Sequence, residues 1–392
     1  MILGVSVFLF GLTLYTYVGY PLLLRLLLLL RGPRQGSAVA PPDVESDWPE
    51  VSIVLTMHNG AAFVKSKLES LAASDYPGLI TVNFVLDGCT DGTADRIQEH
   101  IAGGYRYPVN VWPQAERHGK ESAIRNALPN LPGSILMFSD ADAELAHDAI
   151  RFLVLKLMEP GVGVACGREI HTTSSEAGAG SGQGAFYRYE HAIKRFQEEL
   201  TSLTYVQGGV FAMWKDLYPP QIPVGATQDG AIAFHTVLSG RRVSYVVEAT
   251  SQEPYNISTA ADFSRRIRTI SRAFYTICCY PQILFSTRQG FFGWHVLSNR
   301  LLRWMTIPIV ILANFCLLPS LFRGNPTPLV ILVCEVVWIA LATAGWALER
   351  QKRRWKLAYF CYYFTYIHLA ATVAMMKILR GQRTSTWTPT TN

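Results

Sequence analysis

Two carboxylates stand two positions apart directly after an apolar run. Residues 134–138 form that run, and Asp140-Ala141-Asp142 follows after Ser139. Carboxylate oxygens suit hard cations such as Mg²⁺ or Mn²⁺, which keep water and substrate phosphates among their ligands. Asp pairs also form turns and cap helices. The pair therefore indicates either a metal and diphosphate site at a strand end or an ordinary turn.

The composition indicates a membrane protein. Hydrophobic residues make up 49% and charged residues 16% of the 392 residues, which is unusual for a wholly soluble chain. The formal net charge is +6, and Lys and Arg cluster beside apolar segments at 31–34, 265–272 and 350–356. This distribution favours membrane flanks and phosphate contacts over a nucleic-acid-binding face.

The 7 cysteines form no C-x-x-C pair, so we expect neither a disulfide framework nor a zinc site, in keeping with a reducing cytosol.

Short β-branched runs alternate with segments of helical periodicity between residues 51 and 138. Such alternation predicts a parallel, doubly wound α/β sheet, whose ligands bind at the carboxyl ends of the strands. The expected strands are Val51–Thr56, Ile80–Leu86, Val109–Trp112 and Ser134–Phe138, and the expected helices are Ala61–Ser74, 92–101 and Glu121–Leu128.

A polar signal follows each expected strand. Any one of the four could be ordinary loop chemistry, but the carboxyl ends of parallel strands meet at one edge of a sheet. Together they predict a crevice for a nucleotide diphosphate. The signals are Met57-His58-Asn59-Gly60, Asp87-Gly88-Cys89-Thr90-Asp91-Gly92-Thr93, Arg117-His118-Gly119-Lys120 and Asp140-Ala141-Asp142.

These motifs resemble the GT-A domain of family 2 inverting glycosyltransferases. Membrane-bound members of that family include synthases of bacterial exopolysaccharides, cellulose and hyaluronan. The resemblance covers about residues 50–275 and, more loosely, the apolar helices that follow. It implies a GT-A fold, a Mg²⁺ or Mn²⁺ cofactor and a nucleotide-diphosphate sugar as donor, with UDP as the expected nucleotide.

The resemblance also implies roles for the strand-end residues. Two positions depart from the family pattern: His58 replaces the usual Tyr before the Asn, and Gly60 replaces the usual acidic residue after it. The implied donor-side residues are Asp87 at the base or ribose with Asn59 beside it, Lys120 in the nucleotide pocket, Asp140 on the donor and Asp142 on the metal.

The second half of the domain is expected to form the acceptor side. Gly208 and Gly209 lie in an apolar run expected to be a strand, where paired glycines allow close approach of a ligand or another backbone. Thr227-Gln228-Asp229 opens an expected helix, and either Thr227 or Asp229 could be its N-cap. In the family an acid ends a Thr-Glu-Asp motif here, so the resemblance makes Asp229 the base that deprotonates the acceptor hydroxyl. It places Gly208, Gly209 and Gln228 beside the acceptor.

Three arginines recur at helical spacing later in the chain. Arg265, Arg268 and Arg272 share one face of an expected helix. They face solvent or lipid headgroups, or they neutralise the diphosphate leaving group. Processive family members carry Gln-x-x-Arg-Trp in this region. This chain lacks that Gln and Trp, which argues against a cellulose-synthase-like polymerase.

Apolar segments lie at both ends of the chain. The segment 2–24 and the basic residues after it predict a retained transmembrane helix that leaves the following domain in the cytosol. Two more spans are expected at Met305–Phe322 and Leu329–Leu348, after an interfacial amphipathic helix within 282–304. Leu357–Leu379 remains open between a fourth span and an interfacial helix.

The expected organisation combines one catalytic domain with membrane helices on either side. Its parts are an N-terminal transmembrane helix with its basic flank at 1–34, a linker at 35–50, a cytoplasmic GT-A domain at 51–275, amphipathic interface helices at 276–304, C-terminal transmembrane or interface helices at 305–379 and a tail at 380–392.

The function expected is an inverting, metal-dependent transfer of a sugar to a lipid-linked or polysaccharide acceptor, in exopolysaccharide or envelope glycan synthesis. The alternatives are a processive polysaccharide synthase and a non-catalytic subunit of an envelope assembly. We expect a multi-pass protein of the cytoplasmic (inner) membrane, in contact with the lipid bilayer and without a nucleic-acid partner. Whether it forms a homo-oligomer or joins an envelope-synthesis complex is left open.

Overall fold

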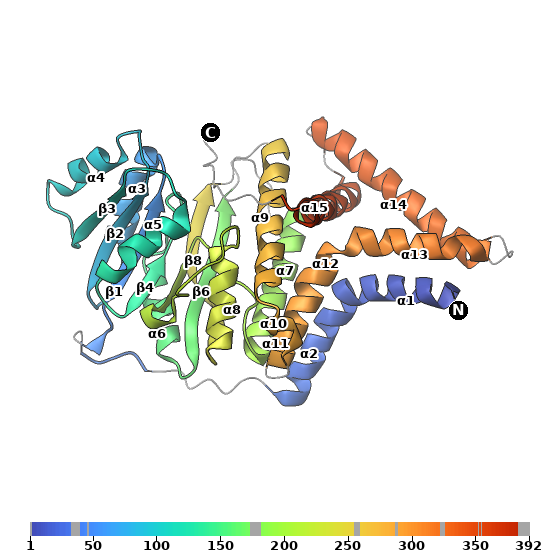
Figure 1. Ribbon diagram of the computed structural model, residues 1–392, viewed down its shortest axis with the longest axis horizontal. Helices are drawn as coiled ribbons and strands as arrows, with labels where there is room; N and C mark the ends of the chain where they lie inside the picture. The colour runs from blue at the N-terminus through green and yellow to red at the C-terminus, as the bar shows by residue number, and fades with distance from the viewer. Residues whose placement is uncertain are drawn as a thin grey trace. The chain divides into compact units, whose positions relative to one another are not determined.

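The computed structural model of the chain describes residues 2–32, 40–44, 47–172, 182–254, 259–286, 289–321, 326–351, 353 and 355–382. They divide into two compact units, each described by itself (Figure 1). The sheet unit contains the described residues between 34 and 174 and between 201 and 257. The helical unit contains those between 1 and 33, between 175 and 200 and between 258 and 384.

The sheet unit is built on an 8-stranded sheet with the order β3-β2-β1-β4-β7-β6-β8-β5. Its strands are β1 (Val51–Met57), β2 (Ile80–Asp87), β3 (Val109–Gln114), β4 (Ile135–Phe138), β5 (Glu144–Leu145), β6 (Val162–Thr172), β7 (Phe211–Trp214) and β8 (Arg242–Pro254). Its α-helices are α3 (Val64–Ala72), α4 (Thr93–Ile101), α5 (Lys120–Ala127), α6 (Ala149–Met158) and α8 (Gln228–Leu238).

The first four strands pair in parallel, as the sequence predicts. Val51 of β1 stands opposite Ile80 of β2 and Ile135 of β4, and β3 pairs with the outer side of β2. Every residue of β2 and β4 is buried, which explains why these strands read as continuous apolar runs. Helix α3 contributes Val64, Leu68 and Leu71 to the same core.

The remainder of the sheet is mixed, and the parallel prediction for residues 51–138 does not extend to these later strands. β7 runs antiparallel to both β4 and β6, while β6 and β8 pair in parallel. These pairings join distant parts of the chain, and local periodicity carries no information about their direction. The paired glycines also differ from expectation, because β7 begins at Phe211 and Gly208 and Gly209 lie in the turn before it. Asp140–Asp142 forms a turn that leads into β5 rather than directly into a helix.

The helical unit contains the segments at the two ends of the chain together with two helices from its middle. Segments 182–200 and 259–275, which the sequence analysis includes in the domain at 51–275, group here with the terminal helices. Its helices are α1 (Ile2–Leu14), the π-helix Tyr15–Gly19, α2 (Tyr20–Arg31), α7 (Gly182–Leu200), α9 (Thr259–Cys279), α10 (Gln282–Phe285), α11 (Gly290–Val296), the π-helix Leu297–Leu301, α12 (Leu302–Trp304), α13 (Thr306–Leu321), α14 (Thr327–Arg350) and α15 (Lys356–Leu379).

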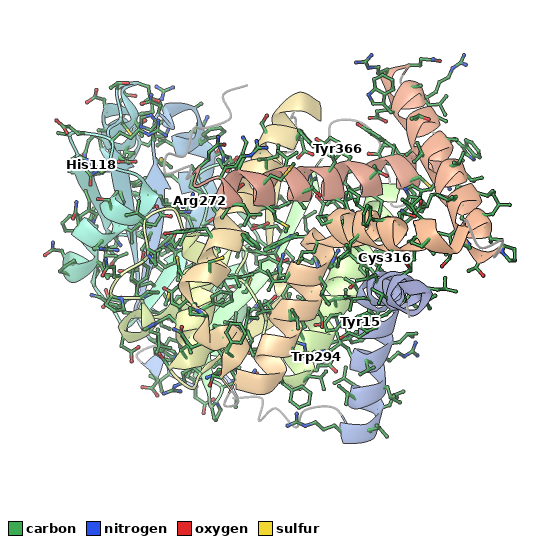
Figure 2. The ribbon with its side chains drawn as sticks, turned by 45° about the vertical axis from the view of Figure 1, so that its right-hand side comes forward. Tyr15, His118, Arg272, Trp294, Cys316 and Tyr366 are labelled. Carbon is green, nitrogen blue, oxygen red and sulfur yellow. The ribbon has the colours of Figure 1, made fainter. Side chains whose placement is uncertain are left out.

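Polar side chains connect the two π-helices of this unit. The Tyr15 hydroxyl lies 2.8 Å from the Ser298 hydroxyl and accepts a 2.8 Å hydrogen bond from the Trp294 indole (Figure 2). Nearby, buried Arg303 of α12 forms a 2.7 Å ion pair with Glu190 of α7. The Tyr15–Ser298 contact thus joins the two π-helices, and the Arg303–Glu190 ion pair joins α12 to α7.

Three helices among the described residues are long and apolar enough to cross a membrane: Leu3–Arg31, Thr327–Arg350 and Lys356–Leu379. The segment left open, Leu357–Leu379, therefore passes the same test as the expected spans at 2–24 and Leu329–Leu348. Helix α13 has 16 residues, and at about 1.5 Å per residue it is shorter than a hydrocarbon core of about 30 Å. It qualifies as a span only together with Gly290–Trp304, from which it is bent by 68°.

Candidate functional site

Four sequence motifs meet at the carboxyl edge of the parallel strands. The loop after β1 carries Asn59, β2 ends at Asp87, the loop after β3 leads to Lys120 and the turn after β4 carries Asp140. The parallel registers of β1 with β2 and β4, and of β2 with β3, bring these strand ends to one side of the sheet. The four motifs predicted to form a crevice therefore lie along one edge of the sheet.

Asn59 connects the first two loops of this edge. It has a left-handed backbone with φ 54°, which Asn tolerates better than most residues. Its Oδ1 accepts a 2.8 Å hydrogen bond from the backbone N–H of Thr90. Asp91 adds a second link, because its carboxylate accepts the N–H groups of Ala61 and Thr93 at 3.0 and 3.1 Å. Burial acts to raise the pKa of Asp91, but hydrogen bonds from the Thr93 hydroxyl and from backbone N–H groups outweigh it and lower this pKa.

Asp87 holds the third loop in place. The carboxylate accepts the backbone N–H groups of His118 at 2.8 Å and Gly119 at 2.9 Å, and the side chain is 3% exposed. A Cβ on the next residue, Gly88, would lie 2.8 Å from the Arg117 nitrogen, so only glycine allows the two loops to approach this closely. The structure thus gives Asp87 a positioning role, and its contact with a nucleotide base or ribose stays a prediction.

Lys120 and Asp140 form an ion pair across the crevice edge. Lys120 Nζ lies 3.2 Å from Asp140 Oδ1, and 43% of the Asp140 side chain is exposed, which leaves the carboxylate accessible to a ligand. Burial lowers the pKa of Lys120, but the carboxylates of Asp140 and Asp229 outweigh it and raise this pKa above its ordinary value. Lys120 therefore carries a positive charge between two acidic groups.

Asp229 shares a small space with Asp140. A methyl group on Gly208 would lie 3.5 Å from Oδ2 of Asp140 and 3.7 Å from both carboxylate oxygens of Asp229. The structure thus brings together the residue expected to contact the donor and the residue expected to act as the base. Gly208 leaves the space between them open.

The start of α8 positions Asp229. Thr227 is the N-cap, because its hydroxyl accepts a 3.1 Å hydrogen bond from the Gly230 N–H. This resolves the alternative left by the sequence, since Asp229 itself lies in the first helical turn. A helix N-terminus favours a negatively charged side chain there. Gln228 is 4% exposed and directs its amide to the Tyr218 hydroxyl at 3.4 Å, and its role beside an acceptor stays a prediction.

Asp142 is half-buried in the same turn as Asp140. Within the described ranges, no group of three or more His, Cys, Asp or Glu side chains could hold a metal ion. A cation here would thus take few protein ligands and complete its shell with water and substrate oxygens. That is the usual coordination of Mg²⁺, which is bound through one or two carboxylates and substrate phosphates. The donor set fits such a cation.

Sequence reasoning missed a buried lysine beneath this turn. Lys67 of α3 is 1% exposed, and its Nζ donates to Ser139 Oγ at 2.6 Å and to the Ala143 carbonyl. Burial lowers the pKa of Lys67 to about 8, against the raising effect of Asp140, Asp142 and other acidic groups. The signal was available in the sequence, because helical spacing puts Lys67 on the apolar face of α3.

Two glutamates near the glycine turn were also missed. Glu169 of β6 accepts the Gly209 N–H at 2.7 Å and the Gln207 side-chain amide at 3.1 Å. A Cβ on Gly209 would lie 2.2 Å from Oε1 of Glu253 and 2.9 Å from Oε1 of Glu169. A side chain at position 209 would thus force these two glutamates to move, whereas a methyl group at position 208 would make only ordinary van der Waals contacts.

The three arginines of α9 lie in the helical unit, whereas the acidic cluster lies in the sheet unit. Burial lowers the pKa of Arg268, and so do the charges of Arg272 and Arg265, as expected for three guanidinium groups on one helical face. Arg266 behaves differently, because it pairs with Asp262 at 2.7 Å and donates to the Tyr363 hydroxyl at 2.9 Å. The contact of Arg265, Arg268 and Arg272 with a diphosphate stays a prediction.

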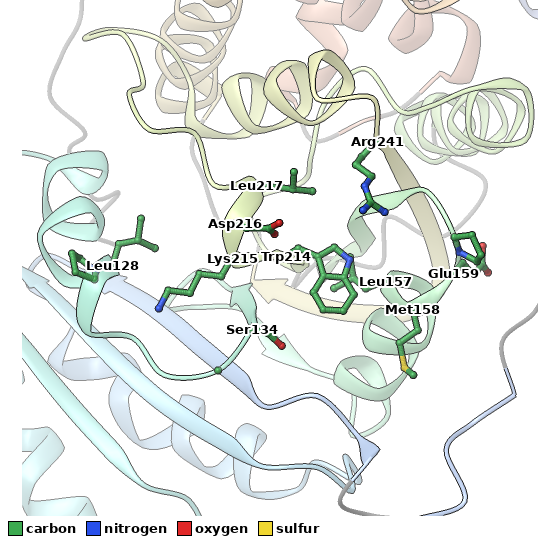
Figure 3. Close-up of a pocket in the computed structure, with 13 residues that line it drawn as sticks. Leu128, Ser134, Leu157, Met158, Glu159, Trp214, Lys215, Asp216, Leu217 and Arg241 are labelled. Atoms are coloured by element: carbon green, nitrogen blue, oxygen red, sulfur yellow. The ribbon is translucent and has the colours of Figure 1, made fainter.

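A groove of about 870 Å³ lies elsewhere on the sheet unit, lined in part by Trp214, Lys215 and Arg241 (Figure 3). Ser134, which also lines it, precedes β4, whereas Asp140 follows that strand. The groove and the acidic cluster therefore lie at opposite ends of β4, and the groove is not part of the candidate site.

Comparison with known proteins identifies the domain that contains this cluster. Residues 52–218 match the model of glycosyl transferase family 2. The chain carries a family 2 glycosyltransferase domain. The matched residues of this glycosyltransferase domain include the four strand-end motifs and the glycine turn, and Asp229 follows them in the chain.

The curated relatives are N-acetylglucosaminyltransferases. The one from Rhizobium sp. (strain N33) is 32% identical over 125 residues, which cover 31% of this chain and 27% of the relative. The one from Rhizobium meliloti (strain 1021) is 30% identical over 149 residues, which cover 37% and 34%. This chain thus aligns with only about a third or less of the length of these relatives.

A solved structure supports the fold of the whole chain. The mannosyltransferase PcManGT from Pyrobaculum calidifontis, in complex with GDP-Man and Mn2+, has a TM-score of 0.72 and 17% identity, and the match covers 98% of this chain and 100% of that one. The predicted GT-A fold, with terminal helices apolar enough to span a membrane, is confirmed.

Proposed function

We propose that the protein is an inverting glycosyltransferase that moves a sugar from a nucleotide-diphosphate donor to an acceptor hydroxyl. The observation that carries the proposal is the arrangement at Gly208, where Asp140 and Asp229 border one small space and Lys120 pairs with Asp140. In this proposal Asp140 binds the donor, Asp229 is the base and Lys120 offsets phosphate charge. Asp140 and Lys120 lie within the matched residues 52–218, and Asp229 follows them in the chain.

Asp229 is the base in this proposal. As the acceptor oxygen bonds to C1 of the donor sugar, its proton passes to the Asp229 carboxylate and the bond from C1 to the diphosphate oxygen breaks. Attack from the face opposite the diphosphate inverts the configuration at C1. The N-cap bond from Gly230 to Thr227 fixes the helical turn that carries the carboxylate. Lys120, held charged beside Asp140, offsets negative charge on the departing diphosphate.

Asp142, with Asp140 beside it, would hold a Mg²⁺ or Mn²⁺ ion together with diphosphate oxygens. When bound, such an ion stabilises negative charge on the leaving group. The exposed Asp140 carboxylate and the small number of protein ligands suit a cation that arrives with its substrate. Arg265, Arg268 and Arg272 are further candidates for neutralising the diphosphate.

A UDP-linked sugar is the proposed donor, with UDP-N-acetylglucosamine as the first candidate. The support is the name of the curated relatives, N-acetylglucosaminyltransferase, which are 32% and 30% identical to this chain over 125 and 149 residues. The proposed acceptor is lipid-linked or a polysaccharide, with Gly208, Gly209 and Gln228 on its side of the site. The product would enter exopolysaccharide or envelope glycan synthesis.

A membrane location supports a lipid-linked acceptor. Large apolar side chains are exposed on the candidate spans, including Leu29 and Leu30 on the first and Val336 on α14. We place the protein in the cytoplasmic (inner) membrane with the glycosyltransferase domain in the cytosol, because the basic residues that follow the first helix favour that side.

The test is a donor screen with the detergent-purified protein and a polyprenyl-phosphate acceptor, with nucleotide release and product mass as readouts. We expect Mn²⁺- or Mg²⁺-dependent release of UDP from UDP-N-acetylglucosamine and a product that is heavier by one sugar. GDP-mannose serves as the comparison donor. A series of products that differ by one sugar each would support a processive synthase instead of single addition. If no nucleotide were released from any donor, the non-catalytic alternative would remain.

A further inference from the structure

A lysine is completely enclosed beneath the turn that carries Asp140 and Asp142. Lys67 is 1% exposed and belongs to the largest fully buried side chains described in the structure. It lies on the apolar face of α3 together with Val64, Leu68 and Leu71, where a hydrophobic residue is the ordinary occupant. Enclosing an ammonium group carries a large desolvation cost unless hydrogen bonds and nearby charges compensate. An apolar side chain would serve the core better, so the lysine requires another explanation.

The hydrogen bonds that the structure describes for Lys67 go to the two ends of that turn. Its Nζ donates to the hydroxyl of Ser139 at 2.6 Å and to the carbonyl of Ala143, the residues on either side of Asp140-Ala141-Asp142. Ser139 in turn contacts the glycine turn, because its hydroxyl donates a 2.8 Å hydrogen bond to the Gly209 carbonyl. One ammonium group thereby ties the acidic turn to α3 and, through Ser139, to the glycine turn.

The positive charge of Lys67 interacts with the carboxylates of the same turn. Asp140 and Asp142 are its strongest charged neighbours, followed by Glu253 and Glu144. A buried cation under clustered carboxylates reduces their mutual repulsion and keeps the turn closed. A neutral hydrogen-bond donor at this position could bond the turn but could not offset that repulsion.

We propose that Lys67 is a positioning residue that fixes the Asp140–Asp142 turn in the geometry that holds the metal complex of the nucleotide-diphosphate donor. This inference rests on the proposed function of the site. Lys67 does not touch the donor or the cation, since it lies beneath the turn. It acts through Ser139 and Ala143, as the hydrogen-bond partners of metal ligands do in other metal sites.

The test compares Lys67→Met, Ser139→Ala and Lys65→Met with the wild-type full-length protein in detergent. Methionine is close to lysine in length and removes the charge and both hydrogen bonds. Ser139→Ala keeps the charge but breaks the connection to Gly209. Lys65 is the matched control, because it lies on the same helix with 69% of its side chain exposed, and its ion pair with Glu69 is long at 3.9 Å. Binding of Mn²⁺ in the presence of UDP is measured by electron paramagnetic resonance, independently of any transfer reaction.

The expected result is a rise in the Mn²⁺ Kd of about 10- to 100-fold in Lys67→Met, the range found for partners of metal ligands. Ser139→Ala shows a smaller rise, and Lys65→Met binds like the wild type. Partial unfolding would reduce the number of sites without changing their Kd, so the readout separates positioning from general stability. If Lys67→Met does not fold, the Kd of Ser139→Ala decides the matter.

Two contrary results are distinguishable. If Lys67→Met binds Mn²⁺ with the wild-type Kd, this inference is overturned and the proposed function remains intact. If Lys67→Met does not fold, a wild-type Kd in Ser139→Ala has the same consequence. Failure of the wild-type protein to bind Mn²⁺ with UDP or with GDP overturns the metal-dependent function and this inference with it.

Discussion

Replacing Gly208 by alanine should abolish transfer while preserving the fold. The added methyl would lie 3.5 Å from Asp140 Oδ2 and 3.7 Å from the Asp229 oxygens, which are ordinary van der Waals distances. Gly208 is not among the glycines with positive φ, so alanine can adopt its backbone conformation. The free energy of unfolding should therefore change by no more than about 1 kcal/mol.

The methyl would nevertheless occupy the space in which the reacting sugar and hydroxyl must meet. A displacement of about 1 Å at a reaction centre costs on the order of 100-fold in rate, so kcat/KM for sugar transfer should fall at least that far. Thermal unfolding and steady-state nucleotide release measure the two effects on one sample. Gly209→Ala is the contrasting variant, because its methyl would lie 2.2 Å from Glu253 and should cost about 1–3 kcal/mol of stability. Full activity in Gly208→Ala would refute the placement of the reaction between Asp140 and Asp229.

Three further variants test how the site is held. Asp87→Asn should destabilise the sheet unit by about 1–3 kcal/mol in denaturant titrations, because one backbone N–H of the third loop loses its acceptor; unchanged stability would contradict the positioning role. Thr227→Ala should cost about 1 kcal/mol through loss of the α8 cap, and Thr227→Ser should restore it, as measured by thermal unfolding. Asp91→Asn should reduce the loss of stability at acid pH. The folded-state pKa of Asp91 is below the ordinary 3.8, so its contribution to the free energy of unfolding is fully present above that value and is lost as the pH falls through the folded-state pKa. If the variant lost stability at acid pH to the same extent as the wild type, the hydrogen bonds to Asp91 would contribute nothing.

The sequence predicted the parts of the fold that depend on local pattern. The runs that begin at Val51 and Ile80 are buried on both faces, and their apolar character marks them as central parallel strands. The polar residues at their ends follow from the same topology. The antiparallel insertion of β7 between β4 and β6 could not be read this way, because it depends on pairing between segments distant in the chain.

In the candidate site, too, some residues could be predicted from local sequence motifs and others depend on contacts between distant parts of the chain. Asp140 and Asp229 were named from their motifs, but only the fold shows that both approach Gly208. Glu169 was missed because its hydrogen bond to Gly209 depends on the β6–β7 arrangement. Lys67 was missed for a different reason. Its position on the apolar face of a short helix was visible in the sequence, but a buried cation there becomes meaningful only once Ser139 and Ala143 are seen beside it.

The proposed mechanism depends on Asp229 as the base of the glycosyl transfer. The most direct measurement compares the wild-type protein with Asp229→Asn for release of UDP from UDP-N-acetylglucosamine in the presence of acceptor, together with the Kd for UDP and Mn²⁺. We expect a fall in kcat of about 100- to 10,000-fold with the Kd unchanged, because in the proposed mechanism the carboxylate accepts the acceptor proton and does not bind the nucleotide. A variant that retains the wild-type kcat would contradict it.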